Sequence, residues 1–268
     1  MPEKTDIPKD WVLELEKVME RLRAPDGCPW DREQDHKSLR KYLIEECSEV
    51  VDAIDLGDMH ELKDELGDVL MNLIFHAQIA KENEQFTFQD VAQNITEKMI
   101  RRHPHVFGDK SAETSADVNE IWADVKATEK SSKGQKTSVL DGIPHSLPSL
   151  RRAQTMQKKA AKVGFDWQDW RGSFDKIEEE LAELRVELES GTDKARMEDE
   201  FGDLMFSMVN FARAFKFEAD DALRGAHQKF ERRFRAVEDE VRPKGWDQYD
   251  LEQLDQIWDQ VKLKEKKA

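Results

Sequence analysis

The sequence has few of the residues that interrupt helices, with only 8 Pro and 12 Gly among 268 residues. Long segments contain neither residue, so we expect a mostly helical protein. Cysteine is also scarce, and Cys28 and Cys47 alone are too few for a disulfide framework. There is no run of 18 apolar residues, and the first residues lack the apolar segment of a signal peptide. These absences predict a soluble, cytoplasmic protein.

Positive charge is in deficit. The chain has 58 Asp and Glu against 42 Lys and Arg, which gives a formal net charge of −16. A field of this sign disfavours binding to nucleic acid and to anionic membrane surfaces. It does not exclude an anionic small molecule as a ligand, provided that a metal ion supplies positive charge. Although 37% of the residues are charged, the apolar residues recur periodically, which indicates a folded chain.

A pattern of five acidic residues occurs twice, at an interval of half the chain. Matched positions are 134 or 135 residues apart in a chain of 268. Neighbouring stretches repeat as well, since residues 64–70 match residues 199–205 and residues 121–126 match residues 257–262. A drift of a few residues in the interval is expected when loops differ between homologous halves. The acidic pattern consists of Glu45, Glu46, Glu49, Glu65 and Asp68, then Glu179, Glu180, Glu183, Glu200 and Asp203.

Apolar periodicity predicts helices in both halves, separated by a polar linker at residues 129–137. The chain between residues 56 and 59 is so short that the helices on either side must be antiparallel. We therefore predict an all-α fold with two tandem helical domains, at residues 1–128 and 138–268. The predicted helices are 11–22, 39–56, 59–80, 88–102 and 118–130 in the first half, and 147–163, 174–188, 194–217, 220–241 and 251–264 in the second.

The acidic residues are predicted to lie at or beside the apolar faces of adjacent helices. On a helical wheel Glu46 falls within the stripe that Leu39 and Val50 form, and Glu65 lies beside the stripe of the next helix. A carboxylate in such a place is costly unless a cation compensates it. Two facing helices with carboxylates at i and i+3 can surround a cation with oxygen ligands. No His or Cys recurs with them, which favours Mg²⁺ or Mn²⁺ over zinc.

An exposed acidic face is the alternative interpretation, because such faces are common in acidic proteins. One copy of the pattern would leave the two interpretations about equal. Common ancestry also explains a repeat without any function. We favour a metal site because the acids recur at core-facing positions, where leucine would stabilise a helical bundle better.

These motifs resemble those of the MazG family of nucleoside triphosphate pyrophosphohydrolases, all-α enzymes with EExxE and ExxD on adjacent helices. Both copies of the pattern fit, at residues 45–49 with 65–68 and at residues 179–183 with 200–203. The resemblance covers nearly the whole chain and matches the tandem bacterial form. Further segments agree, namely CPWD at 28–31, RRHPHVFG at 101–108, LDGIP at 140–144, VGFDW at 163–167 and QKFERRF at 228–234.

The resemblance implies Mg²⁺-dependent hydrolysis of a nucleoside triphosphate to the monophosphate and pyrophosphate, in a homodimer. Glu45 and Glu179 become candidates for orienting or deprotonating the attacking water. Because the acids would contact only metal and phosphate, we expect broad base specificity and a role in clearing unwanted (d)NTPs. The implied metal ligands are Glu46, Glu49, Glu65 and Asp68 in the first half, and Glu180, Glu183, Glu200 and Asp203 in the second.

Several other side chains are candidates for binding substrate. Lys229 and Arg233 are one helical turn apart and can clamp pyrophosphate. Asn210 and Arg213 follow the second acidic motif and suit recognition of sugar or phosphate. Trp258 can stack on a base, although a role in the core is the more common one for such a residue. Further candidates in the first half are Lys98, Arg102 and Lys126.

The two halves differ after the ExxD motif. The first half has Phe75 and Gln78 where the second has Asn210 and Arg213. We therefore expect the second half to be the better catalyst, while the intact acids of the first leave its activity open.

Two other functions are compatible with an acidic helical protein. The first is a regulator that binds nucleotide or a protein partner without turnover. The second is a di-iron bundle, which needs Glu-x-x-His on two helices. The only such spacing here is Glu33 to His36, and it has no counterpart in the second half. We rank the di-iron bundle last.

Overall fold

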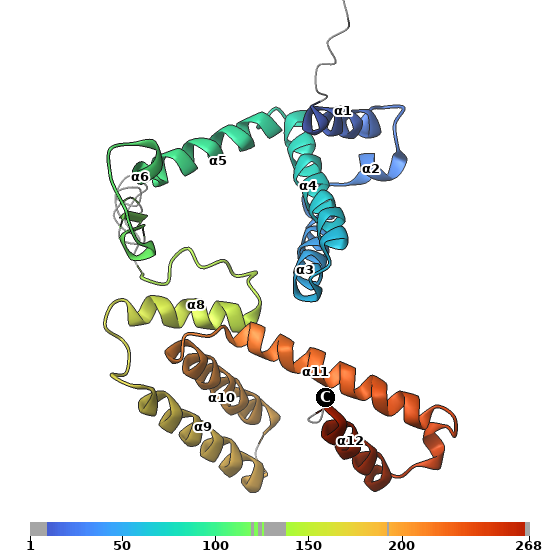
Figure 1. Ribbon diagram of the computed structural model, residues 1–268. Coiled ribbons are helices and arrows are strands. Elements are labelled where there is room, and N and C mark those ends of the chain that lie inside the picture. Colours follow the sequence, from blue (N-terminus) through green and yellow to red (C-terminus); the bar gives the residue numbers. More distant parts are fainter. Residues whose placement is uncertain (1–9, 119–120, 123–124, 126–137, 192, 266–268) are drawn as a thin grey trace, which may run out of the picture. The chain divides into compact units, whose positions relative to one another are not determined.

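The computed structural model describes residues 10–118, 121–122, 125, 138–191 and 193–265 (Figure 1). All regular elements in these ranges are helices, and the chain divides into two compact units, Met1–Gly134 and Gln135–Ala268. The predicted all-α fold with tandem helical domains is therefore confirmed. The predicted linker, residues 129–137, lies outside the described residues. Among the described helices, none is long and apolar enough to span a bilayer.

Unit 1 and unit 2 (the two compact units in chain order) have similar series of helices. In unit 1 a further helical segment starts at Ser115, three residues before the predicted start, and part of it lies outside the described residues. The helices of unit 1 are α1 (Trp11–Arg23), α2 (Pro29–Glu33), α3 (Arg40–Leu56), α4 (Met59–Glu82), α5 (Phe88–Arg102) and α6 (Pro104–Phe107). Those of unit 2 are α8 (Ser149–Ala161), α9 (Trp170–Ser190), α10 (Lys194–Ala214), α11 (Ala219–Val241), the 3₁₀ turn η1 (Trp246–Gln248) and α12 (Leu251–Glu265).

Each unit contains a helical hairpin, formed by α3 and α4 in unit 1 and by α9 and α10 in unit 2 (Figure 1). The first helix of each pair ends at a glycine in the left-handed region, Gly57 with φ 71° and Gly191 with φ 64°. Glycine has no Cβ and adopts this conformation without strain. The second helix begins with an aspartate cap: Asp58 accepts from His60 N at 2.9 Å, and Asp193 accepts from Ala195 N at 3.3 Å. These four residues explain the tight antiparallel turns.

Two helix boundaries in unit 2 differ clearly from the predicted ones. Helix α9 starts at Trp170 rather than Phe174, because Asp169 caps it by accepting a hydrogen bond from Arg171 N at 2.8 Å. Helix α10 stops at Ala214 rather than Phe217, since Lys216 has a φ of 61° and cannot continue a right-handed helix. The apolar periodicity of the sequence continues through both boundaries. It could not predict them, because it carries no information on the local backbone conformation.

The helix that packs on the hairpin is apolar in unit 1 and polar in unit 2. Helix α1 places Met19 on α4, in a buried cluster with Leu39, Ile74, Phe75 and Ile79. Helix α8 instead packs on α10 with two buried glutamines. Gln154 Nε2 donates to Phe217 O at 2.7 Å, and Gln157 Nε2 donates to Phe206 O at 2.8 Å. Gln157 therefore joins α8 to α10, and Gln154 joins α8 to the segment after α10, whereas unit 1 has an apolar cluster.

Candidate active site

Both hairpins bring acidic side chains together across their two helices. In unit 1, carboxylate oxygens of Glu46, Glu49 and Glu65 lie within 4.8 Å of one another. In unit 2, those of Glu180, Glu200 and Asp203 do the same. Only oxygen donors take part, and this donor set fits a hard divalent cation better than zinc.

The fourth acid of each predicted ligand set lies outside these close groups. Asp68 in unit 1 and Glu183 in unit 2 are not part of the groups whose oxygens all lie within 4.8 Å of one another. Their charges nevertheless act on Glu46 and Glu200, respectively. The structure thus brings together three of four predicted ligands per unit and places the fourth nearby.

Burial of the acids is uneven. Glu180 is only 5% exposed, whereas Glu46, Glu65 and Glu200 are half-buried. The core-facing position that the helical wheel predicted for Glu46 is therefore reached only in part, whereas its counterpart Glu180 is buried. The remaining acids of the two patterns are exposed, because one side of each hairpin is not covered by other described helices of its own unit. They are Glu45, Glu49, Asp68, Glu179, Glu183 and Asp203.

Crowding of like charges perturbs the acids in the same direction in both units. Burial raises the pKa of Glu46, and a hydrogen bond with Glu49 and the charge of Asp68 raise it further. The pKa of Glu200 is raised by burial first, then by the charges of Glu183 and Glu180. Glu65 in unit 1 also has a raised pKa, again with burial as the main cause. A bound cation would relieve this repulsion.

Lys176 is a site residue of unit 2 that the sequence analysis missed. Its Nζ lies 2.8 Å from Glu179 Oε1 and 2.6 Å from Glu180 Oε1. Hydrogen bonds to Glu179 and then Glu180 raise the pKa of the Lys176 ammonium above its ordinary value. The i to i+4 spacing of Lys176 and Glu180 was the available signal.

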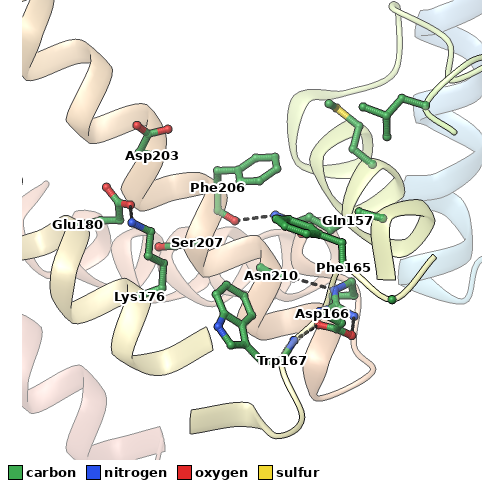
Figure 2. Close-up of a pocket in the computed structure, with 15 residues that line it drawn as sticks. Gln157, Phe165, Asp166, Trp167, Lys176, Glu180, Asp203, Phe206, Ser207 and Asn210 are labelled. Atoms are coloured by element: carbon green, nitrogen blue, oxygen red, sulfur yellow. Dashed lines mark hydrogen bonds and ion pairs between the residues drawn. The ribbon is translucent and has the colours of Figure 1, made fainter. Parts of the chain in front are cut away.

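Unit 2 contains a cavity of about 690 Å³ that opens onto the acidic group (Figure 2). Four predicted site residues line it, namely Glu180, Asp203, Asn210 and Arg213. A volume of this size is typical of small-molecule sites. Besides Lys176, the remaining lining residues are Leu140, Met156, Gln157, Ala160, Gly164, Phe165, Asp166, Trp167, Phe206 and Ser207.

A polar network lines the cavity near the C-terminal end of α10, away from the acidic group. Arg213 Nη1 donates to Asp166 Oδ2 at 2.9 Å, and Arg213 Nη2 also pairs with Asp166 Oδ1. Arg213 Nε donates to Asn210 Oδ1 at 2.7 Å. The Arg213 guanidinium lowers the pKa of Asp166 below its ordinary value. Asp166 belongs to the VGFDW segment, whose contact with Arg213 the sequence analysis did not foresee.

Three predicted substrate-binding residues of unit 2 do not line this cavity. Lys229 is exposed on α11, and Arg233 on the same helix pairs with Glu265 of α12, with Nε 2.7 Å from Oε2. Trp258 on α12 is half-buried and packs on Phe230, with ring centroids 5.4 Å apart. Within unit 2, the structure therefore keeps these residues out of the cavity that Glu180 and Asp203 line.

The predicted substrate-binding residues of unit 1 have surroundings different from those of unit 2. Lys98 and Arg102 are half-buried on α5, and Lys126 lies outside the described residues. Phe75 is only 2% exposed and packs edge-on against Trp30, with ring centroids 6.5 Å apart. An apolar ring thus fills, in unit 1, the position that Asn210 has in unit 2.

Comparisons with known proteins agree with these motifs. A family profile described as "MazG nucleotide pyrophosphohydrolase domain" matches residues 34–107 and 172–237, which contain both acidic patterns. The chain is 45% identical over 251 residues to the nucleoside triphosphate pyrophosphohydrolase/pyrophosphatase MazG of Thermotoga maritima, across 93% of this chain and 94% of that protein. It is 46% identical over 252 residues to the nucleoside triphosphate pyrophosphohydrolase of Escherichia coli K12, across 92% and 95% of the two chains. A crystal structure of a mazG-related protein from Thermotoga maritima aligns with 43% of this chain and 98% of its own, at 25% identity and a TM-score of 0.38.

Proposed function

The chain belongs to the MazG family of nucleotide pyrophosphohydrolases, and we propose that unit 2 carries its main catalytic site. The reaction is hydrolysis of a nucleoside triphosphate or its deoxy form to the monophosphate and pyrophosphate. Curated relatives with this named activity match the chain at about 45% identity over more than nine-tenths of its length. The observation that favours unit 2 is its cavity, whose lining includes Glu180 and Asp203 together with Asn210.

We assign the metal as Mg²⁺, with Mn²⁺ as a substitute. In unit 2 it would be held by Glu180, Glu183, Glu200 and Asp203, and the oxygen-only donor set supports this choice. When bound, such an ion neutralises charge on the phosphates and increases the acidity of a coordinated water.

The other residues at this end of the cavity act through charge and position. Lys176 supplies an ammonium group beside Glu179 and Glu180, where a triphosphate would bring negative charge. Glu179 is exposed and lies on the same helix as Glu180, so it is placed to accept a proton from the attacking water. In unit 1, Glu45 has the matching position.

Unit 1 retains the acids but not the polar lining. Its Glu46, Glu49 and Glu65 form a comparable oxygen cluster, with Asp68 nearby. Phe75, at the position that corresponds to Asn210, is buried in an apolar cluster. We therefore propose that unit 1 has little turnover and a mainly structural role.

We propose a homodimer, because apolar side chains stay exposed at matching positions of both hairpins. Three such pairs recur 134 or 135 residues apart and are about half exposed. A second copy of the chain is the partner that would cover the same surface in both units. The pairs are Ile54 and Leu188, Leu66 and Phe201, and Leu73 and Met208.

We place the activity in the cytoplasm, where nucleoside triphosphates are made and used, and we expect it to act on all bases. The acidic residues of the metal group would contact only the metal and the phosphates, so they provide no contact that selects a base.

Product analysis tests the proposed reaction directly. The full-length protein is incubated with each NTP and dNTP and with Mg²⁺, and the nucleotide products are separated. We expect the monophosphate and pyrophosphate in equal amounts, and no product without a divalent cation. Diphosphate with inorganic phosphate would contradict the assigned bond. Binding without any product, at every metal concentration, would instead support a non-catalytic nucleotide-binding protein.

A further inference from the structure

We propose that Asn210 recognises the nucleobase, and that Arg213 and Asp166 are positioning residues that fix the orientation of the Asn210 amide. This inference rests on the proposed function of unit 2 and names the groups that contact one part of its substrate. It also revises the role expected for Arg213, which the sequence analysis assigned to sugar or phosphate.

Arg213 is already committed within the protein. Its side chain is 12% exposed, and its guanidinium pairs with the Asp166 carboxylate through both terminal nitrogens. Its Nε donates to Asn210. A two-point pair of this kind compensates the positive charge and fixes the plane of the guanidinium. To bind a phosphate, Arg213 would have to break its ion pair with Asp166. We therefore assign Arg213 a positioning role at the site.

That task is to orient Asn210. An arginine nitrogen can only donate, so the amide oxygen of Asn210 must face Arg213, at 2.7 Å from Nε. The amide nitrogen Nδ2 then points elsewhere, and within the described residues it has no acceptor. Asn210 lines the cavity, so Nδ2 is a donor available to a ligand there.

The position of Asn210 along α10 matches the base rather than the sugar. Asn210 is seven residues after Asp203, which amounts to two helical turns, or about 10 Å along the axis and nearly the same face. A ribose attached to a metal-bound phosphate ends well before that distance, whereas the base extends to it. Figure 2 shows Glu180 and Asp203 on one side of the cavity and Phe165 and Asp166 on the other.

An aromatic wall accompanies the amide. Trp167 lines the cavity, and its backbone N donates to Asp166 Oδ1 at 2.9 Å. The indole lies directly on the α9 backbone at Gly172, where an added Cβ would come within 2.2 Å of Trp167 Cδ1. The absence of a Cβ at Gly172 therefore permits this close packing of the Trp167 indole, which lines the cavity together with Asn210. Stacking on such a surface tolerates every base.

A single amide donor is compatible with broad specificity. Every natural nucleobase has a carbonyl oxygen or an unprotonated ring nitrogen that can accept from Nδ2. The donor orients the base without selecting one of the four.

The decisive experiment substitutes Asn210→Asp, which keeps an oxygen for Arg213 but replaces the donor with an acceptor. Pyrophosphate release is measured with ATP and with 1-deoxyribose 5-triphosphate, which carries no base. We expect the KM for ATP to rise about tenfold or more while kcat changes little, because an oxygen facing the base acceptors repels them. The loss in kcat/KM should be confined to the substrate that has a base. An equal loss on both substrates would overturn the role of Asn210.

Arg213→Lys and the double variant test the positioning role. If Arg213 acts only through Asn210, the two changes are not additive, and the double variant resembles Asn210→Asp alone. Additive losses that extend to the substrate without a base would show a direct contact of Arg213 with phosphate or sugar and overturn the positioning role. Asp166→Asn serves as a second variant if Arg213→Lys does not fold. Failure of the proposed function is distinguishable, because the unmodified protein would then release no pyrophosphate from ATP.

Discussion

Asn210 in α10 and Phe75 in α4 occupy equivalent places in the two units, 135 residues apart. Asn210 lines the cavity of unit 2 and accepts a hydrogen bond from Arg213, whereas Phe75 is buried against Trp30 and Met19 in unit 1. At this one position, unit 2 has a polar side chain that lines a cavity and unit 1 has an apolar ring in the core, although both hairpins keep their acidic groups. The proposed functional difference between the units rests on this contrast.

Substitution of one acid in each unit measures this difference. Glu180→Gln replaces a buried, proposed metal ligand of unit 2 and should lower kcat by at least about a hundredfold. Glu46→Gln changes the matching residue of unit 1 and should leave kcat within about threefold, since unit 1 is assigned little turnover. Pyrophosphate release under saturating ATP and Mg²⁺ is the measurement. A larger loss from Glu46→Gln than from Glu180→Gln would transfer the main site to unit 1.

The Phe75 ring should matter for stability instead of turnover. Phe75→Ala empties a well-packed place in the core of unit 1 and should cost about 3–5 kcal/mol in the free energy of unfolding of that unit. Phe75→Leu keeps most of the volume and should cost much less. Calorimetry suits this test, because two units can unfold in separate transitions. An unchanged unfolding profile for Phe75→Ala would show that unit 1 is not held by this core.

The repeat in the sequence predicted the hairpins well, because their determinants are local. Gly57 and Asp58 end one helix and start the next within two residues, and Gly191 and Asp193 repeat the arrangement. The acidic patterns were also predictable, since residues at i and i+3 on two joined helices must lie near one another. Periodicity was sufficient wherever the structure depends on near neighbours.

The inner part of the site was not predictable in the same way. Asp166 pairs with Arg213 across 47 residues, and that contact depends on the path of the loop between α8 and α9. The helical wheel placed Glu46 in an apolar stripe, but burial depends on which helices cover the stripe. The wheel contains no such information, so it could not separate buried Glu180 from half-buried Glu46.

Acid should weaken unit 1 through Glu82. Arg23 on α1 is 8% exposed, and its Nη2 lies 2.7 Å from Glu82 Oε2 on α4. The Arg23 guanidinium holds the pKa of Glu82 below its ordinary value of about 4.5. Since the folded pKa is the lower one, this pair stabilises the fold fully above pH 4.5, and the contribution is lost as the pH falls through the folded pKa.

Glu82→Gln isolates this contribution. At neutral pH the variant should be less stable by about 1–2 kcal/mol, because the partner of a buried guanidinium is lost while Glu82 itself is partly solvated. The difference between the variant and the unmodified protein should shrink as the pH falls from 5 to 3. Denaturant unfolding at a series of pH values measures it. A constant difference across that range would contradict the ionic origin of the effect.

Lys229 and Arg233 lie on α11 and do not line the cavity of their own chain. If they clamp pyrophosphate, as their spacing suggests, the second copy in the proposed homodimer must supply them. This arrangement predicts complementation between two inactive variants, Glu180→Gln and the double variant Lys229→Ala with Arg233→Ala. In a mixed dimer one site would combine an intact Glu180 with an intact Lys229 and Arg233 from the other chain. The purified mixed dimer should then have about half of the activity of the unmodified protein, since one of its two sites is free of substitutions.

Co-expression with two different affinity tags produces the mixed dimer, and pyrophosphate release measures its activity. Each variant purified alone is the control and should be nearly inactive. If both residues served the site of their own chain, every site in the mixed dimer would carry a defect, and activity would not return. Full activity of the Lys229→Ala and Arg233→Ala protein alone would instead exclude both residues from catalysis. The experiment therefore separates a shared site from a site within one chain, because only the shared arrangement leaves one site of the mixed dimer free of substitutions.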